Sequence, residues 1–270
     1  ARGGGRSYGD SALADSVLNT RFLDNFISLN TDQNTLRCGS GVQLKELLHL
    51  VIPAGYFPPV LPGTKYVTVG GAIAADIHGK NHHQEGSFCE HVSCLTLLLA
   101  SGEILNCSGT ENKELFLATC GGMGLTGIIL DATIFLKRVP SVSINQETRI
   151  AHSLSECMDI FDSVEDSEYS VAWLDGLARG KKKGRSLVHT GCHSTEGEKR
   201  PISRRELSIP SLTPAMVLNK YSLQLFNEFV YKSQLIKRKS KKVNYESYFF
   251  PLDSIRNWNF LYGSRGFIQY

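Results

Sequence analysis

The sequence predicts an α+β fold, and three observations carry the prediction. Apolar residues recur at i, i+3, i+4 and i+7 from Leu44 to Val51, which is typical of one face of a helix. Side chains alternate from Ile128 to Lys137 in the period-2 pattern of a strand. Glycine is concentrated before Pro140 and basic residues after it. We therefore expect two mixed regions, 1–139 and 140–270.

Each element follows from a local pattern. In the first region Pro53 and Gly55 end the expected helix, and a long irregular stretch rich in Pro and Gly runs from Phe57 to Lys80. The other elements expected there are strands at 26–29, 35–38, 92–99, 103–107 and 128–137, and a helix near 111–121. The second region is expected to hold a helix near 154–161 and strands near 170–174 and 187–190.

Composition excludes several classes of protein. The chain has 270 residues, of which 41% are hydrophobic, and a net charge of +3, which together exclude intrinsic disorder. Seven cysteines without a regular spacing exclude a small disulfide scaffold. No apolar run is long enough to cross a bilayer, and no signal peptide is visible, so we expect a cytoplasmic protein or one at the membrane surface. Because the sequence starts without Met inside a glycine loop and stops in what reads as a strand, we expect it to be part of a longer chain.

Basic residues gather in two runs of the second region. Residues 1–140 carry 10 basic and 12 acidic side chains, whereas residues 141–270 carry 19 and 14. The runs are 181–185 and 232–242. They are interpreted either as solvated, mobile loops or as a surface that attracts anionic lipid. No aromatic residues suited to base stacking accompany them, so we expect no nucleic-acid partner.

Two glycine-rich segments point to a bound diphosphate. Residues 1–10 hold four glycines and two arginines, so backbone N–H groups and fixed positive charge lie close together. Small residues recur over 62–64 and 68–75, which we interpret as a second loop. The glycine spacing is not that of a Rossmann fingerprint. Two such loops suit a long ligand with a central diphosphate, such as FAD.

Histidines and cysteines follow the second segment. The residues with spacing resembling that of metal ligands are His78, His82, His83, Cys89, His91 and Cys94. No paired Cys-x-x-Cys accompanies them, so we expect no metal site.

Three strings carry a resemblance to a known family: RGGGRSYGD, PVLPGTKYVTVGGAIAADIHGKNHH and GGMGLTGIILDATI. They resemble the flavin domain of the vanillyl-alcohol-oxidase family of FAD enzymes, which has a PCMH-type fold. The resemblance implies an FAD-binding domain at 1–139 that lacks its beginning. It also implies an α+β cap, or substrate, domain at 140–270 that has an antiparallel sheet and lacks its end.

By this resemblance a defined set of residues contacts FAD. The set is Ala1, Arg2, Gly3, Gly4, Gly5, Arg6, Ser7, Tyr8, Gly9, Asp10, Ser11, Gly63, Thr68, Val69, Gly70, Gly71, Ala75, Asp76, Ile77, His78 and Ile129. In related sugar-lactone oxidases a histidine before the serine of the first loop bonds covalently to the flavin. Arg6 stands at that position here, so we expect FAD to be non-covalent.

The resemblance also implies a reaction. The expected reaction is oxidation of the 2′-hydroxyl of a polyprenyl-phosphate-linked pentose to a ketone, which is the first half of an epimerisation toward arabinose for cell-wall synthesis. A short-chain NAD(P)H-dependent reductase is the expected partner for the second half. The candidate catalytic residues are His78, Tyr8 and Lys80, and the candidate substrate-binding residues are Lys80, Trp173, Phe249, Leu252 and Gln269. Two alternatives stay open: an FAD oxidase of a soluble sugar, alditol or aldonolactone, and a non-catalytic domain that binds a ligand or metal.

Overall fold

The structure is a computed structural model that describes residues 1–7, 12–202, 207–209, 211, 219–236, 239–257 and 260. The chain divides into two compact units. The first comprises Ala1–Pro140 and Lys199–Pro201, and the second comprises Ser141–Glu198 and Ile202–Tyr270.

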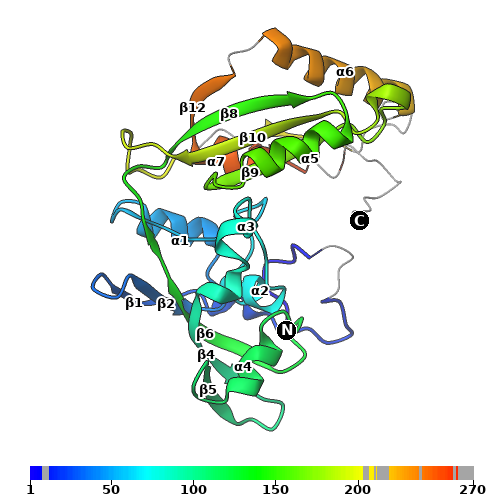
Figure 1. Cartoon of the computed structure of the whole chain (residues 1–270). Helices are drawn as coiled ribbons and strands as arrows, with labels where there is room; N and C mark the ends of the chain where they lie inside the picture. The colour runs from blue at the N-terminus through cyan, green and yellow to red at the C-terminus, as the bar shows by residue number, and fades with distance from the viewer. Residues whose placement is uncertain are drawn as a thin grey trace. The chain divides into compact units, whose positions relative to one another are not determined.

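A five-stranded antiparallel sheet forms the frame of the first unit (Figure 1). Its strand order is β1-β2-β6-β4-β5. The strands are β1 (Phe26–Asn30), β2 (Thr35–Gly39), β4 (Val92–Leu98), β5 (Ile104–Ser108) and β6 (Ile128–Phe135). All five were expected from the sequence, and β4 and β5 pair as the hairpin that Ser101 and Gly102 predict. A separate two-stranded pair joins β3 (Tyr56–Phe57) to β7 (Lys137–Arg138).

Helix α1 (Leu44–Val51) has the bounds that its apolar spacing predicts. Leu44, Leu47, Leu48 and Val51 are all buried, and a capping box formed by Gln43 and Glu46 closes its first turn. Helix α4 (Lys113–Thr119) lies within the expected range. The remaining short helices of this unit are η2 (Thr20–Phe22), α3 (His82–Glu85) and η3 (Phe88–His91).

The interpretation of residues 68–75 as a loop is wrong, because Val69–Ala74 form helix α2. Two glycines in six residues lower helix propensity by about 1 kcal/mol each, which is why the pattern did not predict it. The buried side chains of Val69, Ala72 and Ile73 favour the helix instead, and the Thr68 side chain caps it by accepting a hydrogen bond from the Gly71 N–H at 3.2 Å.

The second unit is built on a four-stranded antiparallel sheet of order β12-β8-β10-β9. The strands are β8 (Ser143–Ala151), β9 (Tyr169–Leu174), β10 (Ser186–His193) and β12 (Ser240–Asn244). Helix α5 (Leu154–Ser163) packs on β8 and β10 through a small core around Cys157 and Val188. Sequence patterns predicted β9, β10 and α5 but neither β8 nor β12. The remaining elements are η4 (Gly180–Lys182), β11 (Leu207–Ser208), α6 (Lys220–Ile236), α7 (Tyr245–Phe249), η5 (Pro251–Ser254) and β13 (Ile255–Arg256).

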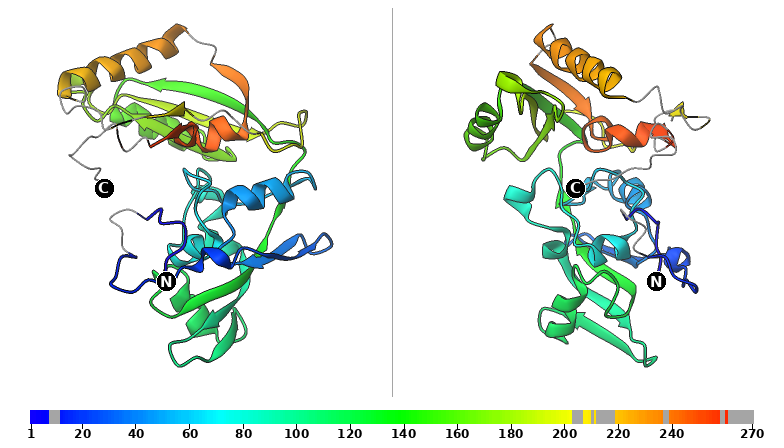
Figure 2. Two further views of the ribbon diagram at one scale, coloured as in Figure 1. Left: turned by 180° about the vertical axis from the view of Figure 1, so that it is seen from behind. Right: turned by 90° about the vertical axis from the view of Figure 1, so that its right-hand side faces the viewer.

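Helix α6 turns Asn227, Glu228 and Tyr231 toward the rest of the second unit and exposes several large apolar side chains. Asn227 donates a hydrogen bond to the Asp175 carboxylate at 2.7 Å, and Glu228 pairs with Arg185 at 2.7 Å. The large apolar side chains exposed on α6 are Tyr221, Leu223, Leu225, Phe226, Phe229 and Leu235. Both views in Figure 2 show α6, in orange, at the outside of the second unit.

The interpretation of residues 232–242 as a loop is wrong for its described residues. Lys232 belongs to α6, and Lys241 and Lys242 belong to β12, with Lys241 pairing across to Gln146 of β8. Lys237 and Arg238 lie outside the described residues. The run 181–185 overlaps the end of the short helix η4 and includes the buried Arg185.

None of the helices in the described residues is long and apolar enough to span a bilayer.

Candidate functional site

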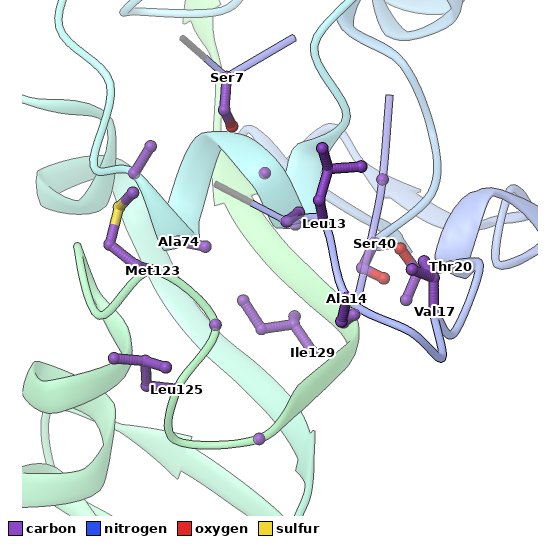
Figure 3. Close-up of a pocket in the computed structure, with 18 of the residues that line it drawn as sticks. Ser7, Leu13, Ala14, Val17, Thr20, Ser40, Ala74, Met123, Leu125 and Ile129 are labelled. Atoms are coloured by element: carbon purple, nitrogen blue, oxygen red, sulfur yellow. The ribbon is translucent and has the colours of Figure 1, made fainter. Parts of the chain in front are cut away.

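A pocket of about 290 Å³ opens in the first unit between the N-terminal segment, α2 and the turn before β6 (Figure 3). The N-terminal wall includes Gly3, Ser7, Leu13 and Val17. The other walls are formed by Ser40, Gly70, Gly71, Ala74, Ala75, Met123, Gly124, Leu125, Gly127 and Ile129. The pocket therefore brings together both glycine-rich segments that the sequence singled out.

The backbone of the glycine-rich segment 1–7 is hydrogen-bonded to the rest of the first unit at Arg2. The Arg2 N–H donates to the Leu18 carbonyl at 2.9 Å, and the Arg2 carbonyl accepts from the Thr20 N–H at 3.0 Å. Within the described part of the chain, the N–H groups of Gly3, Gly4 and Gly5 donate to no acceptor. Gly5 has φ +62°, a left-handed conformation that favours glycine. Adjacent unpaired N–H groups of this kind make a concave site for an anion.

Several glycines of the site are required by packing within the protein. A Cβ at Gly3 would collide with Thr68 Oγ1, and a Cβ at Gly70 would lie 2.8 Å from Ser40 Cβ. The segment 1–7, α2 and the end of β2 therefore approach each other as closely as their backbones permit.

The backbone N–H groups in the first turn of α2 already donate hydrogen bonds within the protein. The Val69 N–H donates to the Val42 carbonyl at 2.8 Å, the Gly70 N–H to the Ser40 carbonyl at 2.8 Å, and the Gly71 N–H to Thr68 Oγ1 at 3.2 Å. Contacts of Thr68, Val69, Gly70 and Gly71 with a cofactor stay a prediction, and these three N–H groups are not available for them.

Positive charge gathers beside segment 1–7. The Arg6 guanidinium lies 5.3 Å from the centre of the Tyr66 ring, with Lys45 Nζ at 5.7 Å and Lys65 Nζ at 5.9 Å. The guanidinium of Arg2 lies so close to Gly5 that a Cβ there would be 2.9 Å from Nη2. This cluster favours an anionic ligand.

The chain after α2 forms a tight, polar turn. Asp76 has φ +40°, and its carboxylate accepts hydrogen bonds from Ser87 Oγ at 2.8 Å and from the Cys89 N–H at 2.9 Å. The next residues are Ile77, whose N–H donates to the Ala72 carbonyl, and His78, which is exposed and bridges to Ser87. The His78 ring lies 5.7 Å from that of His82.

Lys80 is half-buried two residues further on. Burial lowers the pKa of its ammonium group to about 8, because the charged form loses hydration. Asn81 fixes the backbone next to it, since its buried side chain donates to the Pro59 carbonyl at 2.8 Å. Burial therefore makes Lys80 easier to deprotonate than an ordinary lysine.

The other predicted site residues lie in different surroundings. Ile129 is buried and lines the pocket, Ala75 lines it and is exposed, and Gly63 is exposed with open space around its Cα. Tyr8, Gly9, Asp10, Ser11 and Gln269 lie outside the described residues.

Three predicted substrate residues belong to the second unit. Trp173 is half-buried on β9, and Leu252 is exposed in η5. Phe249 is buried at the end of α7, with its ring 4.9 Å from that of Tyr169 and 5.2 Å from that of Tyr248. The structure thus gives Phe249 a place in an aromatic cluster, and its contact with a substrate stays a prediction.

Part of the pocket wall was not among the predicted residues. Met123 has φ +53° and Gly124 φ +76°, and with Leu125 and Gly127 they form the turn that leads into β6. The string GGMGLTG lies within one of the three strings that carry the family resemblance, but none of its residues was among those expected to contact FAD. Leu13 and Val17 carried no signal, because their place depends on the pairing of Arg2 with Leu18 and Thr20.

In the ranges that the structure describes, no group of three or more His, Cys, Asp or Glu side chains lies close enough to hold a metal ion.

In the described part of the chain, segment 1–7 combines unpaired N–H groups with a cationic flank, beside a pocket floored by α2 and Ile129, which suits an anionic ligand. Residues 1–108 match the model of the family described as FAD binding domain. The whole chain is 36% identical to the decaprenylphosphoryl-beta-D-ribose oxidase of Mycolicibacterium smegmatis and covers 62% of that protein.

More distant relatives match shorter parts. An L-gulonolactone oxidase of Bos taurus is 32% identical over 62% of this chain and 38% of its own length. Cytokinin dehydrogenase 3 of Oryza sativa is 36% identical over 38% of this chain and 19% of its own length. The chain thus spans less than two thirds of the length of each of these relatives.

Proposed function

We propose that this chain is part of an FAD-dependent oxidoreductase that oxidises the 2′-hydroxyl of a polyprenyl-phosphate-linked pentose to a ketone. The observation that supports the proposal most is the 36% identity to a decaprenylphosphoryl-beta-D-ribose oxidase along the whole chain. The shorter matches to a lactone oxidase and a cytokinin dehydrogenase support the broader class of flavin oxidoreductases.

Segment 1–7 would hold the diphosphate of FAD. The N–H groups of Gly3, Gly4 and Gly5, which donate to no acceptor among the described residues, would supply donors, and Arg2 and Arg6 would supply charge. When bound, FAD supplies the acceptor for a hydride from the carbinol carbon. Binding is proposed to be non-covalent, because the guanidinium of Arg6 offers no nucleophile where related lactone oxidases place a histidine.

His78 and Lys80 are proposed to act on the substrate. His78 is exposed just beyond α2, where its imidazole can accept the hydroxyl proton at a ring nitrogen. Lys80 would pair its ammonium group with the phosphate of the lipid-linked sugar. Tyr8 is a third proposed catalytic residue and lies outside the described residues.

The second unit is proposed to meet the lipid. The exposed apolar side chains of α6 and the lysines at 220, 232, 241 and 242 combine the two features of a helix that lies on an anionic membrane surface. The ketone product would then pass to a reductase that uses NAD(P)H, because an epimerisation that begins with an oxidation needs a reduction to complete it.

Spectroscopy of the purified full-length protein tests the proposal. We expect a flavin absorbance band, with the flavin released on denaturation, and bleaching of that band when polyprenyl-phosphoryl ribose is added without oxygen. Bleaching by a soluble sugar but not by the lipid-linked one would favour the soluble-sugar oxidase. A colourless protein that cannot be reconstituted with FAD would overturn the proposal in favour of a non-catalytic domain.

His78→Ala separates the chemical step from cofactor binding. We expect this variant to slow flavin reduction by about 10²–10⁴-fold, the usual contribution of a general base, while FAD affinity changes little. Stopped-flow absorbance measures the reduction rate, and an unchanged rate would remove His78 from the mechanism.

A further inference from the structure

Lys80 lies on a closed loop, residues 76–89, which we call the Lys80 loop. The loop is joined at its base, because His78 forms an antiparallel bridge with Ser87, and the Asp76 carboxylate accepts a hydrogen bond from Ser87 Oγ at 2.8 Å. Helix α3 lies between the two ends of the loop. These base contacts lie on either side of Lys80 in the sequence and do not hold it directly.

Asn81 ties the loop to the core at the residue after Lys80. Its side chain is only 1% exposed, and Nδ2 donates to the Pro59 carbonyl at 2.8 Å. Pro59 belongs to the buried run 56–61, so this hydrogen bond joins the loop to the core of the first unit. The Asn81 carbonyl accepts the N–H groups of Gln84 and Glu85 at 2.9 and 2.8 Å, which starts α3. Asn81 thus binds the core with its side chain and the helix with its backbone.

The chain approaches the same core segment at the residue before Lys80. A Cβ at Gly79 would lie 2.9 Å from the Leu61 carbonyl oxygen and 3.2 Å from the Leu61 nitrogen. Gly79 and Asn81 therefore both lie against residues 59–61, one on each side of Lys80. The Lys80 side chain starts from this fixed backbone and is half-buried.

The acidic residues of the Lys80 loop, Asp76 and Glu85, have partners of their own. The Asp76 carboxylate accepts two hydrogen bonds from within the loop, and Glu85 Oε1 lies 3.5 Å from Lys137 Nζ. The two histidines of α3 are exposed. Burial is the cause of the low pKa of Lys80. A change in that pKa would therefore report a change in the burial of the ammonium group.

We propose that Asn81 is a positioning residue for Lys80: by tying the loop to Pro59 it holds the Lys80 side chain half-buried, where it would meet the substrate phosphate. The meeting with the phosphate rests on the proposed function, whereas the anchoring of Lys80 does not. Without the anchor the loop keeps its base contacts, but the segment around Lys80 can move away from residues 59–61 and admit water. Hydration favours the ammonium form, so the pKa of Lys80 should rise toward the ordinary value of 10.5.

Amine labelling tests the anchoring without any substrate. The full-length protein carrying FAD is treated briefly with acetic anhydride at a series of pH values below and above 8. Chymotrypsin then cleaves after Tyr66 and Phe88 and releases peptide 67–88, in which Lys80 is the only lysine. Mass spectrometry gives the acetylated fraction of this peptide at each pH. Because only the neutral amine reacts, the midpoint of the curve is the pKa of Lys80.

We expect a midpoint of about 8 in the wild type. In Asn81→Ala it should rise by about one pH unit or more, because the ammonium regains hydration. Asn81→Leu fills a similar volume without an N–H donor and should raise the midpoint in the same direction, which covers the case that the alanine variant fails to fold. Circular dichroism identifies the folded variants, and a wild-type midpoint in either folded variant would overturn the proposal.

Asn112→Ala is the matched control. The Asn112 side chain also donates to a backbone carbonyl, that of Asn106 at 2.7 Å, and the residue has φ +47° at the N-cap of α4. The control should therefore also lower stability, but it should leave the midpoint of Lys80 at about 8. An equal rise in Asn112→Ala would show a general loosening of the protein and would overturn the assignment to Asn81.

Steady-state kinetics with polyprenyl-phosphoryl ribose test the link to the substrate. At pH 7 we expect Asn81→Ala to raise KM by about fivefold or more, the equivalent of one ordinary hydrogen bond, with little change in kcat. An unchanged KM in a variant with a raised labelling midpoint would overturn the role in substrate binding and leave the anchoring. A wild-type protein that does not turn over this substrate would overturn the proposed function, and the labelling result would still decide the anchoring.

Discussion

Gly70 lies where the end of β2 packs against α2, and the contact leaves no room for a side chain. Its missing Cβ position is 2.8 Å from Ser40 Cβ, and its N–H donates to the Ser40 carbonyl. Any larger residue must push α2 away from β2, and α2 forms part of the pocket floor. A glycine that was predicted to let a ligand approach thus lets two segments of the protein approach each other.

We expect Gly70→Val to lower the free energy of unfolding by about 1–3 kcal/mol through overpacking. It should also weaken FAD binding, because the pocket floor moves. Urea denaturation measures the first effect and quenching of FAD fluorescence the second. Gly109→Ala is the matched control: nothing lies within 4 Å of that site, so its stability should stay within about 0.5 kcal/mol of wild type. Wild-type FAD affinity in Gly70→Val would contradict this account.

The proposed role of Lys80 predicts that substrate affinity depends on pH. Its pKa is lowered to about 8, so the ammonium is charged below that pH and neutral above it. If Lys80 holds the substrate phosphate, KM should rise as the pH increases from 7 to 9. Lys80→Arg should remove this dependence, because arginine stays charged throughout the range. A steady-state pH profile measures it, and a flat wild-type profile would contradict the role.

At the scale of elements, Arg185 joins α6 to the sheet of the second unit. Its Nη2 lies 2.7 Å from Asp175 Oδ2 and its Nη1 lies 2.7 Å from Glu228 Oε2. The guanidinium carbon is 4.6 Å from the centre of the Tyr231 ring. Burial acts to raise the pKa of Asp175, but hydrogen bonds from Arg185 and Asn227 outweigh it and lower that pKa.

We expect Arg185→Met to cost about 3–5 kcal/mol of stability, because it leaves the Asp175 carboxylate buried without its cation. Lys232→Met is the control: Lys232 also pairs with Glu228, but its side chain is 67% exposed, so the loss should stay below about 1 kcal/mol. Denaturant titration followed by circular dichroism compares the two. Equal losses would show that burial does not determine the strength of these ion pairs.

Helices and strands were predictable from sequence where one face of the element packs against the core. Helix α1 and strand β6 bury apolar residues at the period of their own backbone, so pattern and structure agree. Helix α2 was missed because its glycines mask a helix that capping and burial stabilise. Helix α6 was missed because its inward face is polar: Asn227 and Glu228 bind the sheet, and the apolar residues point to solvent.

At the scale of the whole molecule, charge and apolar surface coincide in the second unit. Residues 141–270 carry the basic excess, and Tyr221, Leu225 and Phe229 are 78%, 73% and 72% exposed. Binding at a membrane surface needs both an apolar face and positive charge. Apolar burial holds a helix in the bilayer, and lysines attract anionic headgroups.

We expect the protein to sediment with phosphatidylglycerol vesicles and to be released as salt increases, since the charge term is screened. Leu225→Glu with Phe229→Glu should reduce binding at least tenfold, because both carboxylates enter the apolar face. Leu117→Glu, on the exposed side of α4 in the first unit, is the control and should bind like wild type. Equal vesicle binding by the double variant would contradict a role for α6.

The cofactor site was only partly predictable, for a geometric reason. Segment 1–7 and Ile129 lie in strings that resemble a known family. A sequence string does not show which glycines offer N–H donors to a ligand and which pack against the protein itself. Only the structure shows that the N–H groups of Val69 and Gly70 are already paired while those of Gly3 to Gly5 have no acceptor among the described residues. Binding of a diphosphate by this segment stays a prediction, and the structure shows which of its N–H groups could make it.

The return of Lys199–Pro201 to the first unit has a consequence for any attempt to divide the protein. The backbone passes between the units after Pro140, again after Glu198 and a third time after Pro201. A protease that cuts once near residue 140 would leave a C-terminal piece that still carries three residues of the first unit. Residues 1–140 expressed alone would therefore lack a native part of their own fold.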